Sequence, residues 1–150
     1  MRRAIELSVG NVRAGRGGPF GAVIARDGRI IAEGVNLVTS TQDPTAHAEI
    51  TAIREACRDL GSFHLTGCEL YASCEPCPMC LGAIYWARLD RVFFAGSRLD
   101  AAEAGFSDAR IYEELSVPAG SRAIPIQQLL RNEALFAFEE WKGKQDRVEY

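Results

Sequence analysis

The sequence predicts an α/β protein in which helices pack on a β-sheet. Segments with the apolar spacing of amphipathic helices alternate with short runs rich in β-branched residues, in the order α-β-β-α-β-α-β. A length of 150 residues is enough to bury a core, and 47% hydrophobic and 25% charged residues are ordinary for a globular protein. We therefore expect a single domain over residues 1–150.

The chain starts with two elements that local patterns define well. A helix is expected over residues 1–15, with Ile5, Val9 and Val12 on one apolar face. A glycine-rich turn follows it. Residues 20–36 predict a β-hairpin, because an Asp-Gly turn separates two short β-branched runs.

The middle of the chain alternates helix and strand twice. A helix is expected over residues 46–60, where apolar positions have helical spacing and Gly61 supplies a stop signal. A short strand over residues 68–73, a helix over 77–89 and a strand over 91–97 follow. Helices and strands that alternate in this way predict helical layers on a central sheet.

The last third of the chain has weaker periodicity. Residues 99–121 predict loop and short helix, and residues 124–130 are a candidate last strand. A final helix is expected over residues 132–144. The polar end, residues 145–150, has the composition of a frayed terminus.

Composition excludes several classes of protein. The net charge is −3 and the sequence has no basic run, which argues against a protein whose main partner is nucleic acid. The sequence lacks an apolar run near the roughly 20 residues that a membrane span needs, and its start lacks the apolar core of a signal peptide. Five cysteines, three of them within seven residues, do not fit a secreted disulfide framework. We expect a reduced, cytoplasmic protein.

The segment SCEPCPMC raises the possibility of a metal site. Cys77 and Cys80 have C-x-x-C spacing, which also fits a redox pair or a disulfide. His47 opens one predicted helix, and the two cysteines open another that follows a strand. Two helix N-termini at the same end of one sheet would bring His47, Cys77 and Cys80 together. These three ligands, with the fourth position left to water, predict one catalytic Zn²⁺ per chain.

Glu49 adds catalytic chemistry to this site. It stands two residues after His47, where its carboxylate would reach the water without binding the metal, and could accept and relay a proton. H-x-E followed by P-C-x-x-C is the pattern of zinc nucleobase deaminases. The alternatives are buried thiols or a closed zinc site in a non-catalytic interaction domain, for which Cys74 is the near candidate for a fourth ligand.

With these motifs the chain resembles the cytidine-deaminase superfamily and, within it, the bacterial guanine deaminases. The strings GGPFGAVI, DPTAHAE, SCEPCPMCLGAIYWAR and DAAEAGF carry the resemblance, and the final Glu-Tyr is similar to that family's ending. The resemblance implies a three-layer α/β/α sandwich with a mixed, roughly five-stranded central sheet. It also implies hydrolysis of guanine to xanthine and ammonia. The tRNA adenosine deaminases and the guanosine deaminases share parts of these strings and remain alternatives.

The resemblance also implies roles for matching residues. Asn36 would hydrogen-bond the purine, and Asp108 would contact the guanine amino edge and assist its departure. Tyr150 would cover the site from the partner chain of a homodimer that exchanges C-terminal segments. Without the resemblance, Asn36 is a turn residue and Asp108 a helix N-cap. The other expected substrate-binding residues share a place in or beside the base pocket: Phe20, Ala48 and Trp86.

Overall fold

The central element of the fold is a mixed four-stranded sheet. The structure is a computed structural model that describes residues 1–149. The strands are β1 (Gly21–Arg26), β2 (Arg29–Val35), β3 (Cys68–Cys74) and β4 (Arg91–Gly96), in the order β2-β1-β3-β4. β1 is antiparallel to β2 and β3, and β4 is parallel to β3.

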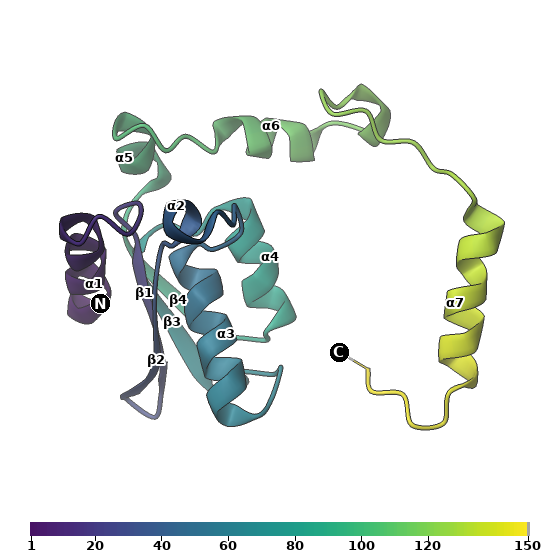
Figure 1. Ribbon diagram of the computed structural model, residues 1–150, viewed down its shortest axis with the longest axis horizontal. Coiled ribbons are helices and arrows are strands. Elements are labelled where there is room, and N and C mark those ends of the chain that lie inside the picture. Colours follow the sequence, from purple (N-terminus) through teal and green to yellow (C-terminus); the bar gives the residue numbers. More distant parts are fainter. Residues whose placement is uncertain (150) are drawn as a thin grey trace. The chain divides into compact units, whose positions relative to one another are not determined.

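Helices cover both faces of this sheet, as Figure 1 shows. α1 (Arg2–Arg13) lies on one face, and α3 (Ala48–Leu60) and α4 (Pro78–Trp86) lie on the other. A short helix, α2 (Val38–Thr41), leads into α3. The predicted α/β/α layers and mixed sheet are confirmed. The core between the sheet and α3/α4 is built from small and branched side chains that include Ala22, Ile24, Ala52, Ile53, Leu65, Leu70 and Ile84.

Two glycines let the helices approach the sheet closely. A Cβ on Gly21 would lie 2.4 Å from the carbonyl oxygen of Ala4 in α1, and a Cβ on Gly34 would lie 2.2 Å from the carbonyl oxygen of Ala48 in α3. Distances this short leave no room for a methyl group. The hairpin therefore sets the position of α3 at its first residue, which directly follows His47.

We expect Gly34→Ala to lower the free energy of unfolding by about 1–3 kcal/mol, the usual effect of overpacking a close contact. Thermal and urea unfolding measure the change. Gly10→Ala in α1 is the matched control, because a Cβ at Gly10 meets nothing within 4 Å. That variant should gain about 0.5–1 kcal/mol from helix propensity. A Gly34→Ala protein as stable as the unchanged chain would contradict the close approach.

The residues of α1 that face the sheet are not the apolar residues that the sequence pattern puts on one side of the helix. Ala4, Ser8 and Asn11 are buried, whereas Ile5 and Val9 remain 41% and 42% exposed. The helix forms as predicted, but its apolar stripe points away from the sheet of its own chain. Small residues are favoured at the buried positions because α1 lies so close to Gly21.

The chain divides into two compact units, residues 1–108 and residues 109 onward. The first contains the sheet with α1–α4 and ends after α5 (Arg98–Glu103). The second contains α6 (Ala109–Ser116), a 3-10 turn (Ala119–Ser121) and α7 (Arg131–Gly143). Among the helices of residues 1–149, none combines the length and the apolar character needed to cross a membrane.

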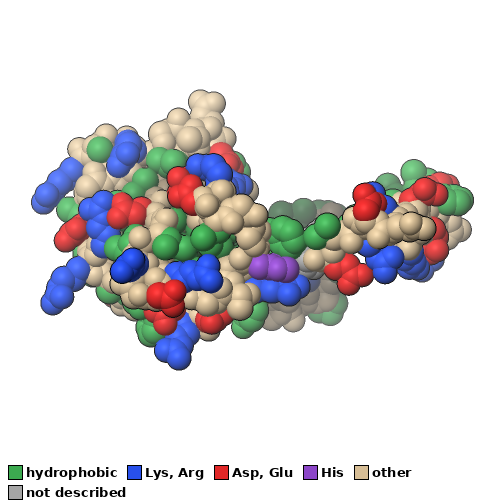
Figure 2. Space-filling model, turned by 90° about the horizontal axis from the view of Figure 1, so that it is seen from below, with side chains coloured by type: hydrophobic (Ala, Val, Ile, Leu, Met, Phe, Trp, Pro, Cys, Tyr) green, Lys and Arg blue, Asp and Glu red, His purple; other side chains and the backbone are tan. Residues whose placement is uncertain are grey.

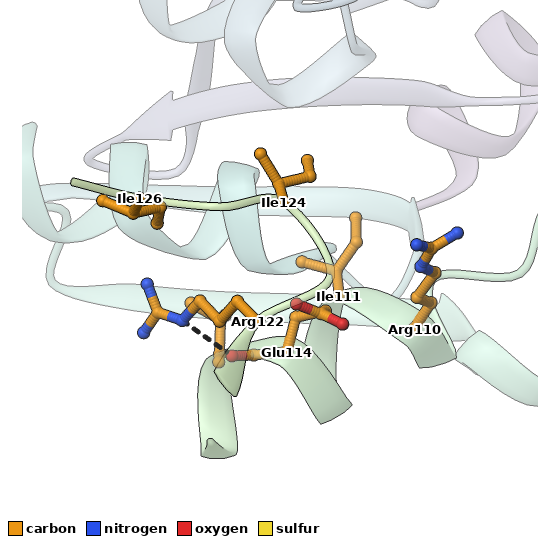
Figure 3. A pocket seen from close by; sticks show the side chains of 7 residues that line it. Arg110, Ile111, Glu114, Arg122, Ile124 and Ile126 are labelled. Atoms are coloured by element: carbon orange, nitrogen blue, oxygen red, sulfur yellow. Dashed lines mark hydrogen bonds between the residues drawn. The ribbon is translucent and has the colours of Figure 1, made fainter. Parts of the chain in front are cut away.

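The prediction of a last strand over residues 124–130 is wrong. This segment pairs with no strand in the described part of the chain. Ile124 and Ile126 instead line a cavity of about 440 Å³ together with Ile111 of α6 (Figure 3). Pro125 separates the two isoleucines and lacks the N–H that a strand needs on that side. The alternating pattern therefore places two exposed isoleucines along this cavity and forms no strand among the described residues.

Candidate zinc centre and base pocket

Three ligand atoms converge where α3 and α4 begin. His47 is the N-cap of α3, Cys77 is the N-cap of α4, and Cys80 lies in the first turn of α4. His47 Nδ1 is 3.5 Å from Cys77 Sγ and 3.4 Å from Cys80 Sγ, and the two sulfurs are 3.6 Å apart. Ligands at zinc bond lengths of about 2.0–2.3 Å in a tetrahedron lie roughly 3.5–3.8 Å apart. The three side chains therefore fit Zn²⁺.

The ionisation of these groups also suits a cation. A hydrogen bond from the Cys80 thiol, with a second from His47, lowers the pKa of Cys77 to about 4. The pKa of His47 is raised, first by its hydrogen bond to Cys77. The pKa of Cys80 is raised because its proton is shared with Cys77 and because it is buried. A thiolate at a helix N-terminus is a ready metal ligand.

Cys74, the alternative fourth ligand, makes a different contact. Its sulfur lies 3.5 Å from the carbonyl oxygen of Ser97, at the junction of β4 and α5. Burial raises the pKa of its thiol. The group of potential ligands that the described residues form consists of His47, Cys77 and Cys80. A fourth coordination position is therefore left for a small molecule.

Glu49 lies in the first turn of α3, beside this cluster. Its side chain is only 7% exposed, and burial raises the pKa of its carboxyl group. The charges of Cys77 and His47 also act on this carboxyl group, Cys77 raising its pKa and His47 lowering it, which places Glu49 beside the metal ligands. A carboxyl group buried beside the metal ligands is placed to accept a proton and to release it again.

Two of the expected substrate-binding residues, Asn36 and Phe20, lie where the glycine-rich turn meets the end of β2. Asn36 is buried, and its side-chain oxygen accepts hydrogen bonds of 3.3 Å from the backbone N–H groups of Gly18 and Val38. Phe20 meets Phe106 edge to face, with ring centroids 5.0 Å apart. Sequence reasoning assigned no role to Phe106. Its only signal was its place in the string DAAEAGF.

For the other predicted site residues, the structure gives a position but no contact with the metal ligands. Ala48 is fully buried as the first residue of α3. Asp108 is half-buried at the end of the first unit. Trp86 ends α4 and is 64% exposed, nine residues after Cys77 and so about 13 Å further along the helix axis. Tyr150 lies outside the described residues. The roles of these four side chains stay predictions.

Comparison with known proteins gives close relatives over the whole chain. The chain is 57% identical to guanine deaminase of Bacillus subtilis over 150 residues. This alignment covers 100% of this chain and 96% of that protein. The solved structure of guanine deaminase from Bacillus subtilis matches with a TM-score of 0.96 and covers 99% of this chain and 95% of that one. The structure of guanine deaminase from Nitrosomonas europaea matches with a TM-score of 0.69 at 30% identity, over 95% and 82% of the two chains.

The tRNA-specific adenosine deaminases match at lower identity than the guanine deaminase of Bacillus subtilis, and one of them, from Haemophilus influenzae, is 38% identical over 87% of this chain and 78% of that protein. A tRNA-specific adenosine deaminase of Aquifex aeolicus is 48% identical over 87 residues, which is 58% of this chain and 56% of that protein. The family model of the cytidine and deoxycytidylate deaminase zinc-binding region matches residues 1–96, where His47, Glu49, Cys77 and Cys80 all lie. The chain therefore belongs to the cytidine and deoxycytidylate deaminase zinc-binding family.

Proposed function

We propose that the chain is a zinc-dependent guanine deaminase, which hydrolyses guanine to xanthine and ammonia. The observation that carries this proposal is an open His47–Cys77–Cys80 cluster with buried Glu49 beside it. The same chain is 57% identical over its full length to a guanine deaminase. The five free cysteines suit a reducing compartment, so the proposal includes a cytoplasmic location.

The residues of the cluster divide the work between binding and proton transfer. His47, Cys77 and Cys80 would hold Zn²⁺, which when bound activates water by lowering its pKa to about 7. Glu49 accepts a proton from the attacking water and donates a proton to a ring nitrogen of guanine. The water oxygen then bonds to C2, which becomes tetrahedral.

Departure of the amine needs a second proton transfer. Glu49, assisted by Asp108, takes the proton of the new C2 hydroxyl group and donates it to the amino nitrogen. The C2–N bond then breaks to release ammonia as the C2 carbonyl forms. One water is consumed and xanthine is left. Because a flat purine is distinguished by the polar groups on its edges, Asn36 and Asp108 are the residues proposed to select guanine.

A panel of guanine, guanosine, adenine, cytosine and tRNA, with ammonia release as the readout, tests the proposal. We expect turnover of guanine. Deamination of guanosine or of tRNA adenosine without guanine would favour another branch of the family. On the face shown in Figure 2, Lys and Arg side chains lie among Asp and Glu side chains, which gives little support to an RNA-binding surface there. Zinc without any deamination would favour a non-catalytic domain.

The metal ligands are tested by cysteine substitutions. Cys77→Ala and Cys80→Ala should each lose most of the zinc, because two protein ligands hold the ion poorly. Cys74→Ala, the matched control, should keep about one zinc per chain. Elemental analysis of the purified proteins measures the content. A protein that keeps full zinc after loss of Cys80, or that loses it after loss of Cys74, would show that the ligand set is wrong.

Asp108→Ala tests recognition of the base. We expect normal zinc content, because the residue is assigned to guanine and not to the metal. Guanine turnover should fall by about 100-fold, the scale of an acid–base contribution. Steady-state kinetics on guanine with parallel zinc analysis measures both effects. Unchanged kinetics would remove Asp108 from the proposed site.

The proposal includes a homodimer with exchanged C-terminal segments. Large apolar side chains are exposed on α4 and β4 of the first unit, among them Leu81, Tyr85, Phe93 and Phe94. The second unit exposes Leu135, Phe136, Phe138 and Trp141 along α7. No residue from 109 to 149 is buried. Exposed apolar surface of this extent is typical of an interface, and an exchanged segment would cover it in both chains.

A further inference from the structure

Asn11 is a fully buried polar residue on α1 that the proposed chemistry does not use. It is 0% exposed, and its side-chain NH₂ group donates two hydrogen bonds. One goes to the carbonyl oxygen of Gly18 at 2.9 Å, and the other to the carbonyl oxygen of Asn36 at 2.8 Å. A single amide thus joins α1 to two backbone segments, at Gly18 and at Asn36, that are distant from each other in sequence.

Those two segments carry two of the residues proposed to bind the base. Gly18 lies two residues before Phe20, and Asn36 is the residue proposed to bind the purine edge. The two segments also touch directly, because Gly18 N–H donates to Asn36 Oδ1 at 3.3 Å. A Cβ on Gly17 would lie only 2.2 Å from the carbonyl oxygen of Asn36. Asn11 therefore links α1 to the place where the glycine-rich turn and the segment at Asn36 pack tightly together.

The side-chain oxygen of Asn11 is in an unfavourable environment. This oxygen is buried and has no hydrogen-bond partner among the described residues. An unpaired buried acceptor is unfavourable, because it gives up its hydrogen bond to water without replacing it. Ser8, one turn earlier on the same buried face, bonds only to the carbonyl oxygen of Ile5 within the helix. Of these two buried polar side chains of α1, Asn11 is the one that reaches the backbone of Gly18 and Asn36.

We infer that Asn11 is a positioning residue for substrate recognition: it holds the backbone of Asn36 against the glycine-rich turn, so that the Asn36 side chain meets the purine edge in a fixed orientation. The inference rests on the proposed function for the identity of the base. Because Asn11 acts through Asn36, its loss should weaken binding of guanine in the ground state and the transition state alike. That change raises KM with little change in kcat.

The test uses the zinc-loaded full chain with Asn11→Ala, and with Asn11→Ser as a milder change should the alanine variant not fold. Ser8→Ala is the matched control on α1. We expect KM for guanine to rise by about tenfold, the effect of one lost hydrogen bond to a polar edge, with kcat within about threefold. Zinc content should be unchanged. Ser8→Ala should leave KM unaltered.

A double-mutant cycle separates positioning from a merely structural role. If Asn11 acts through Asn36, Asn11→Ala combined with Asn36→Ala should raise KM no more than Asn36→Ala alone. Additive effects on KM would overturn the inference. So would an unchanged KM in a folded single variant. Failure of both Asn11 variants to fold would make Asn11 a core residue, which also overturns it.

Amide hydrogen exchange tests the role of Asn11 without any substrate. The Gly18 and Val38 amides both donate to Asn36 Oδ1, so both should lose protection when Asn11 is replaced. Unchanged protection in a folded variant, or lost protection without a change in KM for guanine, would overturn the inference. If the unchanged chain does not deaminate guanine, the proposed function fails instead, and the exchange rates still decide whether Asn11 holds Asn36.

Discussion

Glu49→Gln is expected to lower guanine deamination by about 100-fold or more while the protein keeps its fold and its zinc. The substitution preserves the size of the side chain and removes the group that accepts and donates protons, and such acid–base contributions are typically 10²–10⁴-fold. Zinc content should persist because His47, Cys77 and Cys80 form the ligand cluster without Glu49. Ammonia release, elemental analysis and thermal unfolding measure the three quantities.

Glu55→Gln is the matched control for this experiment. It makes the same chemical change on the same helix, at a side chain that pairs with Arg58 away from the metal ligands. Its activity should equal that of the unchanged chain. A Glu49→Gln protein with nearly full activity would mean that another group moves the proton, and a protein without zinc would place Glu49 among the ligands.

Removal of residues 145–150 is expected to lower activity by about 100-fold, the scale for loss of a group that orders the reacting centre. Tyr150 is proposed to cover the purine with its aromatic face and to exclude water from the site. Zinc content should be retained, because the ligands lie in the first unit. Arg147→Ala, which keeps the length of the tail, is the control and should remain active.

Co-expression of the tail-deleted chain with the Glu49→Gln chain tests whether the tail acts in the partner's site. In an exchanged dimer, the tail-deleted chain supplies an intact Glu49 and the other chain supplies the tail, so each mixed dimer has one complete site. Random pairing makes half of the dimers mixed, and we expect about a quarter of the unchanged activity. No recovery, or a monomer by size-exclusion chromatography, would contradict the exchange.

The sequence alone was enough to predict the elements that carry the metal site. An Asp-Gly turn between β-branched runs predicts a hairpin, and the structure has β1 and β2 at that place. His47 and Cys77 stand at predicted helix starts, and both are N-caps in the structure. These features are local, because capping, turn chemistry and ligand type depend on residues a few positions apart.

The tertiary structure decided which faces are buried and which segments meet. Ile5 and Val9 of α1 are exposed, because the helix turns Ala4, Ser8 and Asn11 toward the sheet, where Gly21 allows a close approach. Ile124 and Ile126 line a cavity beside α6 and form no strand. In each case the apolar pattern predicts that a side chain prefers to be covered, but it does not say which surface, if any, of the same chain covers it.

The surroundings of the proposed base-binding residues Phe20 and Asn36 depend on the same kind of long-range packing. Phe106 reaches Phe20 across 86 positions of sequence, and Asn11 reaches Asn36 across 25. No local pattern marks either pair. The sequence by itself determined the metal ligands and the helices that present them, because their chemistry and spacing are local. The fold decided which aromatic ring meets Phe20 and which amide meets Asn36, because such contacts exist only once helix, turn and strand have packed together.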